Sequence, residues 1–236
     1  MIPAAKKGTR IMDKVTSKKL SELKSLTHGF YTRAGAPANL VTVHQVHSPT
    51  AVVVEQPWTA EQQPKADALV TNRPDILLGI KTADCAPILL ADAQAGVVAA
   101  AHAGWRGALD GVLDDTVKKM ISLGADAKNI VAAIGPCIGP QSYEVSAGFE
   151  TPFLAQDPVN AQFFKPAAKV GHLMFDLPGY VADRLKRLGV QVVEDVARDT
   201  MTDEATFYSH RRATLRQAEK QEGRQMSVIG IKPPMG

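Results

Sequence analysis

The stretch of sequence that decides the fold runs from residue 87 to residue 107 and reads PILLADAQAGVVAAAHAGWRG. Residues 87–91 and 97–102 are short apolar runs bounded by turn-forming residues, a pattern typical of strands. From Trp105 onward, apolar side chains recur at helical spacing, and Gly124 follows the last of them. This stretch therefore predicts two strands followed directly by a helix.

Short apolar runs of the same kind continue on both sides of this stretch. Further strands are expected at residues 40–47, 51–54, 76–81, 130–134, 190–193, 206–210 and 226–231. Further helices are expected at residues 17–26, between Ser146 and Pro158, and at 176–188. Helices are too few for a regular alternation with strands, so the sequence predicts one α/β-type domain with mixed or antiparallel sheets. Residues 1–28 are expected to form a polar N-terminal arm, and residues 29–236 the folded domain.

Composition excludes several classes of protein. The 236 residues are 45% hydrophobic and 22% charged, with a net charge of +3, as in ordinary globular proteins. Aromatic residues make up 6% and do not alternate with the basic residues, which argues against a nucleic-acid surface. The most apolar stretch, 86–101, is too short to span a membrane, and the N-terminus lacks the apolar run of a secretory signal. A cytoplasmic protein is expected.

Two histidines and one cysteine stand at the ends of expected strands, where side chains often line a cleft. His47 and His102 each stand at the end of an expected strand, and Cys85 directly precedes another. The chain has two cysteines, too few for a disulfide framework, so reduced thiols are expected. The spacing is unlike that of a zinc finger, and each residue alone is also explained as a core cysteine or a strand-end polar group. From these residues alone, a metal site stays one interpretation among others.

Six segments together resemble one known family, the laccase-domain family, whose members are also called polyphenol oxidases or peptidoglycan-editing factors. The segments are His44-Gln45-Val46-His47, Lys65-Ala66-Asp67-Ala68-Leu69-Val70-Thr71, Thr82-Ala83-Asp84-Cys85, His102-Ala103-Gly104-Trp105-Arg106-Gly107, Gly135-Pro136-Cys137-Ile138-Gly139-Pro140 and Phe207-Tyr208-Ser209-His210-Arg211-Arg212. The resemblance implies a fold of two packed mixed sheets flanked by helices, with residues 29–236 as the catalytic domain.

The resemblance also implies a metal site and an activity. Family members hold zinc between two histidines and a cysteine, which correspond to His47, His102 and Cys85. They are described as purine nucleoside enzymes that phosphorolyse adenosine, inosine and methylthioadenosine and deaminate adenosine. Two imidazoles and a thiolate leave one position of a tetrahedral zinc open, as in catalytic zinc sites. The implied partners are therefore a nucleoside and phosphate, and the implied catalytic residues are the three ligands themselves.

Four further residues are candidates for substrate binding. Arg106, one turn into the expected helix, and Arg33 are candidate contacts for an anion, because a guanidinium binds phosphate in a two-pronged manner. Gln45 shares a strand face with His47 and is a candidate for hydrogen bonding to substrate. Asp84 is a candidate for orienting a metal ligand or for capping a turn. Cys137, in a Gly-Pro turn, is interpreted as structural.

Three alternatives to a zinc nucleoside enzyme remain open at this point. Cys85 with His102 as its base forms the pair that a cysteine hydrolase needs, which fits a family role in editing a cell-wall precursor. A metal that only ties strands together is the second alternative, and it predicts a fourth protein ligand. A copper-dependent polyphenol oxidase is disfavoured, because a multicopper site needs more histidine ligands than the six in this chain.

Overall fold

The computed structural model describes residues 13–217 and 223–233. The described strands are β1 (Lys14–Val15), β2 (Leu26–Tyr31), β3 (Ala51–Val53), β4 (Ala68–Thr71), β5 (Leu77–Thr82), β6 (Ala86–Asp92), β7 (Val97–Ala103), β8 (Val131–Ile134), β9 (Glu144–Ser146), β10 (Phe164–Pro166), β11 (His172–Phe175), β12 (Val192–Asp195) and β13 (Gln225–Ile231). The described α-helices are α1 (Lys18–Glu22), α2 (Trp105–Asp110), α3 (Val112–Ser122), α4 (Thr151–Gln156), α5 (Leu177–Arg187) and α6 (His210–Leu215). Short 3-10 helices span Ala60–Gln62, Ala127–Asn129 and Pro158–Phe163.

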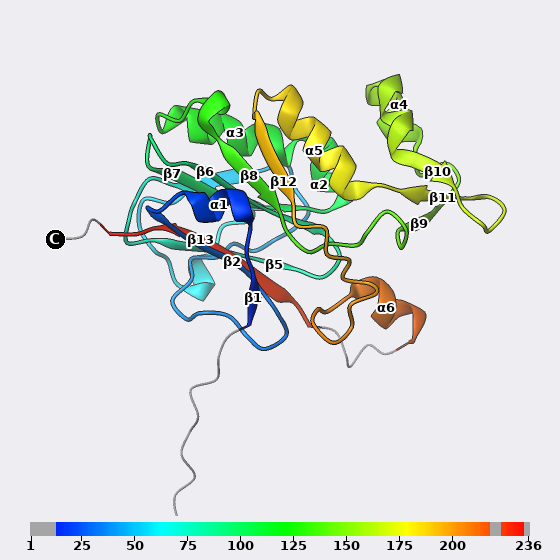
Figure 1. Cartoon of the computed structure of the whole chain (residues 1–236), viewed down its shortest axis with the longest axis horizontal. Helices are drawn as coiled ribbons and strands as arrows, with labels where there is room; N and C mark the ends of the chain where they lie inside the picture. The colour runs from blue at the N-terminus through cyan, green and yellow to red at the C-terminus, as the bar shows by residue number, and fades with distance from the viewer. Residues whose placement is uncertain (1–12, 218–222, 234–236) are drawn as a thin grey trace, which may run out of the picture.

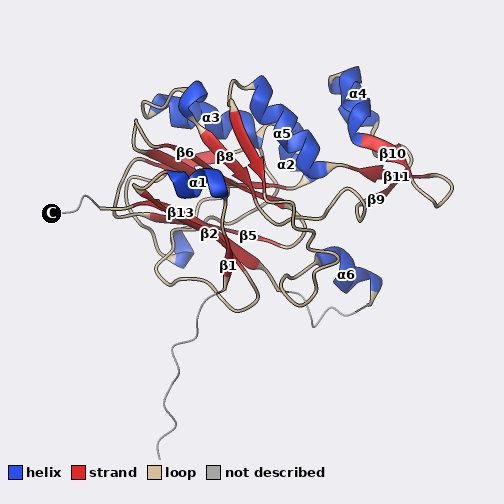
Figure 2. Ribbon diagram, viewed as in Figure 1, coloured by secondary structure: helices blue, strands red, loops and turns tan. Residues whose placement is uncertain are grey.

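Two packed sheets with helices on one outer face form the body of the molecule (Figures 1 and 2). The six-stranded sheet has the order β12-β8-β6-β7-β4-β3 and is mixed, since β12 pairs with β8 and β3 with β4 in parallel. The four-stranded sheet has the order β1-β2-β13-β5 and is antiparallel throughout. The predicted fold class is thus confirmed, although only the larger sheet is mixed.

Strand β6 shows why the decisive stretch lies at the centre. Successive side chains of a strand point to opposite faces. Ile88 and Leu90 pack among the residues beneath α3 and α5, whereas Leu89 and Ala91 pack against the four-stranded sheet. All four side chains are buried, because helices cover one face and a second sheet covers the other. A continuous apolar run is therefore required here in place of the usual alternation.

A third, three-stranded sheet extends to one side of the body and was not predicted. Its order is β10-β11-β9, and it lies beside α4 (Figure 1). The aromatic rings of Phe149, Phe153, Phe164 and Phe175 pack together there, with centroids 4.7–6.3 Å apart. This aromatic cluster holds the small sheet and α4 onto the larger core.

Three predicted elements differ in the structure. The expected helix that starts at Trp105 is broken by Gly111, whose φ of 104° separates α2 from α3. Residues 40–47 form isolated bridges at Val41 and His44, not a strand, and residues 206–210 lead as a loop into α6. These two segments have strand-like composition, but their backbones form hydrogen bonds with several different elements and not with one partner strand.

The segment predicted as a polar arm contributes to the fold where it is described. Residues 1–12 lie outside the described part, while β1 and α1 follow, and the expected boundary at residue 28 falls within β2. Leu20 of α1 and Leu26 of β2 are buried in the core cluster that both sheets share, which explains why this segment folds with the body. Within residues 13–217 and 223–233, no helix is long and apolar enough to cross a membrane.

A carboxylate from the other end of the chain caps α1. Glu194 on β12 accepts hydrogen bonds from the backbone N–H groups of Lys18 and Lys19, at 3.0 and 2.7 Å, and from the Ser17 hydroxyl. Glu194→Ala is expected to lower the free energy of unfolding by about 1–2 kcal/mol, because these helix donors lose a charged acceptor. Urea denaturation measures the change. Glu22→Ala is the control: it removes only an exposed pair with Lys19, and an equal loss there would contradict the capping role.

Candidate metal centre

Three metal-binding side chains converge at one end of the β6–β7 pair. Cys85 directly precedes β6, and the antiparallel register places Pro87 opposite His102 near the end of β7. His47 reaches the same point from the loop that precedes β3. The donor atoms of the three residues all lie within 4.8 Å of one another, and Cys85 Sγ is 3.9 Å from His47 Nε2. The structure thus brings together the three residues that were predicted as ligands.

This donor set fits a zinc ion. Zinc bonds of ~2.1 Å to nitrogen and ~2.3 Å to sulfur place tetrahedral ligand atoms roughly 3.5 Å apart, close to the separations here. Among the residues that the structure describes, no fourth protein donor joins the group. Three protein ligands with one position left for another molecule are typical of catalytic sites, whereas structural zinc usually has four.

Asp67 orients His102. Its Oδ1 lies 2.8 Å from His102 Nδ1, and both side chains are buried. A proton held on Nδ1 leaves the Nε2 lone pair for a metal, so this contact selects the ring tautomer that can bind one. Asp67 precedes β4, the strand next to β7, and its backbone carbonyl also accepts a 2.7 Å hydrogen bond from the His102 N–H.

The same carboxylate fixes the loop that carries His47. It accepts hydrogen bonds from the backbone N–H groups of Val46, His47 and Ser48, at 3.2, 3.0 and 2.6 Å, and from the Ser48 hydroxyl at 2.8 Å. His47 has a φ of 60°, a left-handed conformation that side chains rarely adopt. Asp67 therefore stabilises a strained backbone and positions both histidines at once.

Three of these polar groups, Cys85, His102 and Asp67, also influence one another's charge. Burial alone raises the pKa of the Cys85 thiol, but hydrogen bonds with His102 and His47 outweigh it and lower the pKa to about 6. Burial opposes charge on His102, yet its hydrogen bonds with Asp67 and Cys85 raise its pKa to about 9. Burial likewise disfavours the Asp67 carboxylate, yet its hydrogen bonds to His102 and Ser48 hold its pKa at about 2. Cys85 is thus poised as a thiolate, the form that binds metals.

Two cavities meet at this centre. The first, here called the aromatic cavity, has a volume of about 200 Å³. Besides residues at the metal centre, its lining includes Trp105, Ile138, Tyr143, Leu177 and Arg211. Trp105 comes from the start of α2, and Tyr143 belongs to the loop that leads into β9. The walls are thus largely apolar, with one guanidinium at the margin.

The second cavity, here called the basic cavity, has a volume of about 460 Å³. Its lining includes His44, Lys81, Thr82 and Arg224, together with His102. The two cavities share four lining residues: His47, Ala83, Cys85 and His210. The ligand group therefore faces an apolar space and a basic space at the same time.

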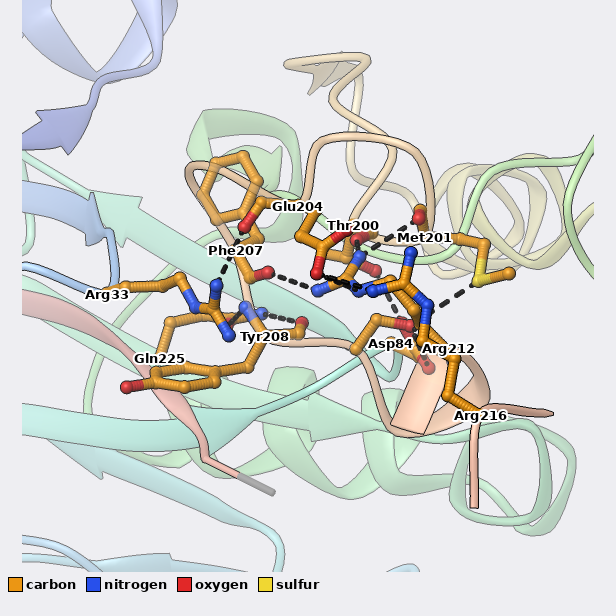
Figure 3. Close-up of polar contacts among 11 residues, drawn as sticks. Arg33, Asp84, Thr200, Met201, Glu204, Phe207, Tyr208, Arg212, Arg216 and Gln225 are labelled. Carbon is orange, nitrogen blue, oxygen red and sulfur yellow. Dashed lines mark hydrogen bonds and ion pairs between the residues drawn. The ribbon is translucent and has the colours of Figure 1, made fainter. Parts of the chain in front are cut away.

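Asp84 fixes the loop that closes the site. Its carboxylate accepts hydrogen bonds from the Thr200 hydroxyl at 2.6 Å, the Ser209 hydroxyl at 3.0 Å and the Arg211 N–H at 2.7 Å. The buried Arg212 guanidinium donates to three carbonyls of the same loop, as Figure 3 shows. None of these three partners is a candidate ligand: the Asp84 carboxylate holds the segment that brings His210 and Arg211 to the cavities. Asp84 also lines the aromatic cavity, and its predicted role as a substrate contact stays a prediction.

The other predicted substrate contacts lie differently. Arg106 is exposed, and its guanidinium stacks over the ring of its neighbour Trp105. Arg33 donates to the Glu204 carbonyl at 2.9 Å and lies over the Tyr208 ring (Figure 3). Neither arginine belongs to the described lining of either cavity.

Gln45 does line the basic cavity, but its amide is engaged elsewhere. The amide nitrogen donates to the Lys81 carbonyl at 2.8 Å, and the Lys81 N–H donates back to Oε1 at 2.8 Å. Gln45 therefore takes the place of a strand partner at the end of β5. Cys137 is buried and stands apart from the ligand group, in keeping with a structural role.

Sequence reasoning passed over residues that the structure brings to the site. Asp67, His210 and Arg211 lie within segments that carry the family resemblance, so a signal for them existed. Thr82 also lies within such a segment, directly before Ala83-Asp84-Cys85. Tyr143 carries no such local signal, because only the packing of distant segments places it there.

Gly104 leaves the space that the ligands occupy. A Cβ atom at this position would lie 2.9 Å from His47 Cδ2 and 3.0 Å from Cys85 Sγ. Its φ of −68° suits alanine, so Gly104→Ala is expected to displace the two ligands without backbone strain. We expect zinc affinity to fall about tenfold or more, since a misplaced ligand weakens the site. Competition with a chromophoric chelator measures this, and unchanged affinity would contradict the crowding.

Comparisons with known proteins agree with this geometry. A purine nucleoside phosphorylase of Rickettsia conorii is 37% identical over 175 residues, covering 74% of this chain and 71% of that protein. A purine nucleoside phosphorylase of Rickettsia prowazekii is 34% identical over 213 residues, covering 90% of this chain and 85% of that protein.

Two solved structures share the fold, and a family model covers most of the chain. A protein of Neisseria meningitidis has a TM-score of 0.75 at 26% identity, covering 89% of this chain and 95% of that one. YlmD from Geobacillus stearothermophilus, at 24% identity, shares the fold with a TM-score of 0.78, covering 89% of this chain and 93% of that one. The model of the multi-copper polyphenol oxidoreductase laccase family matches residues 22–232. The chain therefore belongs to this laccase family, which confirms the resemblance of its motifs.

Proposed function

We propose that this chain is a zinc-dependent purine nucleoside phosphorylase that acts on adenosine, inosine and methylthioadenosine, and also deaminates adenosine. The observation that carries the proposal is the ligand group of His47, Cys85 and His102, which opens onto both an apolar and a basic cavity. Relatives that are 34% and 37% identical bear the name purine nucleoside phosphorylase, which supports the same class of activity.

The aromatic cavity suits a purine base. Trp105 and Tyr143 offer flat faces, and Ile138 and Leu177 add apolar contact, as in pockets that bury a planar ring. Burial raises the pKa of Tyr143, so its hydroxyl stays protonated and neutral beside the substrate. Arg211 is held in place at the margin, since its guanidinium donates to the Glu144 carbonyl at 2.7 Å and lies over the Tyr143 ring.

In the proposed reaction, a phosphate oxygen forms a bond to C1′ of the nucleoside as the glycosidic bond breaks. The bonding electron pair leaves with the purine nitrogen, which takes a proton, and the products are the free base and ribose 1-phosphate. Zinc, when bound, supplies a Lewis acid that stabilises negative charge in the site. Asp67 keeps His102 in one orientation, and the missing side chain of Gly104 leaves room for His47 and Cys85. Deamination of adenosine would be a separate reaction at the base: the oxygen of a water molecule forms a bond to C6, the bond from C6 to the amino nitrogen breaks, and ammonia leaves to give inosine with the glycosidic bond intact.

A second candidate function follows from the contacts among the side chains of Cys85, His102 and Asp67. A thiol, an imidazole and a carboxylate in contact form the arrangement of a cysteine hydrolase, and the Asp67–His102 distance is 2.8 Å. Such an enzyme would cleave an amide of a cell-wall precursor without a metal. Zinc and this chemistry exclude each other, because a thiolate bound to zinc no longer acts as a free nucleophile.

One experiment separates the two candidates. Purified protein is stripped with a chelator, divided, and reloaded with zinc, with copper or with nothing, and each sample is given adenosine or inosine with and without phosphate. Chromatography is expected to show free base only with metal and phosphate together, and inosine formed from adenosine without phosphate. Turnover of an amide by the stripped sample, with no nucleoside turnover by any sample, would instead favour the hydrolase.

We propose the cytoplasm as the location, since a thiolate ligand requires a reducing compartment. The proposed partners are the nucleoside and phosphate. A multicopper oxidase is not proposed, because the chain has six histidines, two of which belong to the ligand group.

A further inference from the structure

The basic cavity has a charge pattern that fits an anion. Lys81, Arg224, His44 and His210 line it, and its described lining contains no Asp or Glu. Lys81 and Arg224 are both exposed, and the Arg224 guanidinium donates a hydrogen bond to the Gly223 carbonyl at 2.9 Å. A basic concave surface without acidic residues raises the local concentration of anions.

Strand pairing explains why these residues meet. Strands β5 and β13 are antiparallel neighbours, and their register places Thr82 opposite Gln225. Arg224 immediately precedes Gln225, and Lys81 immediately precedes Thr82. The ends of two paired strands of the four-stranded sheet, β13 and the edge strand β5, thus place a lysine, a threonine and an arginine at one cavity wall.

Thr82 supplies an independent observation that points to a ligand. Its side chain is 1% exposed, and within the described residues its Oγ1 has no hydrogen-bond partner. A buried hydroxyl without a partner costs about 1–3 kcal/mol, so native proteins rarely retain one without a reason. Thr82 lines the basic cavity and lies three residues before Cys85. An oxygen atom bound in this cavity would accept the missing hydrogen bond.

We propose that the basic cavity binds inorganic phosphate as the attacking substrate, with the Thr82 hydroxyl, the Lys81 ammonium and the Arg224 guanidinium as its contacts. This inference rests on the proposed function and assigns a subsite to it. Phosphate offers several acceptor oxygens, and charge-assisted hydrogen bonds to Lys and Arg are among the strongest in proteins. Neither arginine predicted from the sequence for this role, Arg33 or Arg106, lines the cavity.

The arrangement divides the reactants between the two cavities. With the purine base in the aromatic cavity and phosphate in the basic cavity, the sugar lies at their shared wall, beside Cys85 and His47. The phosphate oxygen would then form its bond to C1′ while the base departs into a separate space. A single cavity for both would place the nucleophile beside the leaving group.

The test uses Thr82→Val and Lys81→Met in the full zinc-loaded protein, with Lys128→Met as the control. Lys128 is an exposed lysine outside the described lining of both cavities. Calorimetry measures the binding of inorganic phosphate alone, and steady-state assays measure KM for phosphate and for inosine separately. Adenosine 5′-monophosphate, titrated in a parallel arm, reports whether the cavity instead prefers a phosphate ester.

Thr82→Val and Lys81→Met are each expected to weaken phosphate binding about tenfold and to raise KM for phosphate equally, with KM for inosine unchanged. Without phosphate, Thr82→Val is expected to unfold at the same or a higher temperature, because valine fits a strand and leaves no hydroxyl unpaired. The Lys128→Met protein should match the wild type.

The possible results distinguish failure of the phosphate subsite from failure of the proposed function. The subsite would be overturned if the wild type bound no phosphate, or if the wild type and both variants bound phosphate with equal affinity. It would also be overturned if the wild type bound the monophosphate ester more tightly than phosphate, and Thr82→Val abolished ester binding but not phosphate binding. Base release by variants with an unchanged KM for phosphate would overturn the subsite and leave the proposed function standing. Phosphate binding that the variants lose, in a protein that splits no nucleoside, would support the subsite and overturn the proposed function.

Discussion

Replacing Cys85 with serine is expected to remove nearly all nucleoside turnover and most of the bound zinc. The thiolate is one of three protein ligands, and its donor atom lies 3.9 Å from that of His47. A serine hydroxyl is a much weaker ligand, since it stays protonated near neutral pH. Loss of a partner that only orients a ligand costs roughly 10–100-fold in affinity or activity, so loss of the ligand itself should exceed that. Metal analysis and a nucleoside assay measure the two effects.

The matched control for this change is Cys137→Ala. Cys137 is buried but lies outside the ligand group, and burial raises the pKa of its thiol well above the usual value. The control protein should retain zinc and activity while losing some stability. A Cys85→Ser protein that keeps full activity would contradict the assignment of Cys85 as a ligand.

Asp67→Asn is expected to have the second largest effect. Asparagine keeps the shape but loses the charge, and its amide nitrogen can donate to His102 Nδ1, which favours the tautomer that presents a hydrogen toward the metal. The same change weakens the bonds to the N–H groups of Val46, His47 and Ser48, which stabilise the left-handed backbone at His47. We expect zinc affinity and activity to fall about 10–100-fold, with a loss of about 2–3 kcal/mol in the free energy of unfolding.

Asp92→Asn provides the comparison for Asp67→Asn. Asp92 is also a buried carboxylate, at the opposite end of β6 from Cys85, and it accepts hydrogen bonds from the N–H groups of Gln94, Ala95 and Asp126. Its replacement should lower stability without changing zinc affinity per folded molecule. If both variants lost stability and zinc in the same proportion, Asp67 would have only a structural role.

The centre of the fold was predictable because its signals are local. Residues 87–102 are apolar on both faces of their strands, and that pattern appears in the sequence as continuous runs. The break between α2 and α3 was not predictable from apolar spacing, since Trp105, Leu109 and Val112 keep helical spacing across Gly111. The error at residues 40–47 has a similar cause: the composition fits a strand, but Gln45 bonds to Lys81 through its side chain.

The candidate ligands could also be predicted from the sequence, whereas the residues that line the cavities could not. His47, Cys85 and His102 stand at element ends within recognisable motifs. Arg106 follows a ligand by four residues and looked close in sequence, yet its guanidinium stacks on the exposed side of Trp105. Arg224 is far from every ligand in sequence and reaches the basic cavity through the pairing of β13 with β5. Such contacts depend on strand order, which apolar patterns do not reveal.

A phosphorus NMR time course of the zinc-loaded protein with inosine and inorganic phosphate decides whether this centre carries out phosphorolysis. We expect the phosphate signal to fall while a sugar phosphate monoester signal rises in equal amount, with matching release of hypoxanthine. The Cys85→Ser protein should show neither change. A constant phosphate signal, with inosine either intact or split to free ribose, would contradict phosphorolysis at this centre.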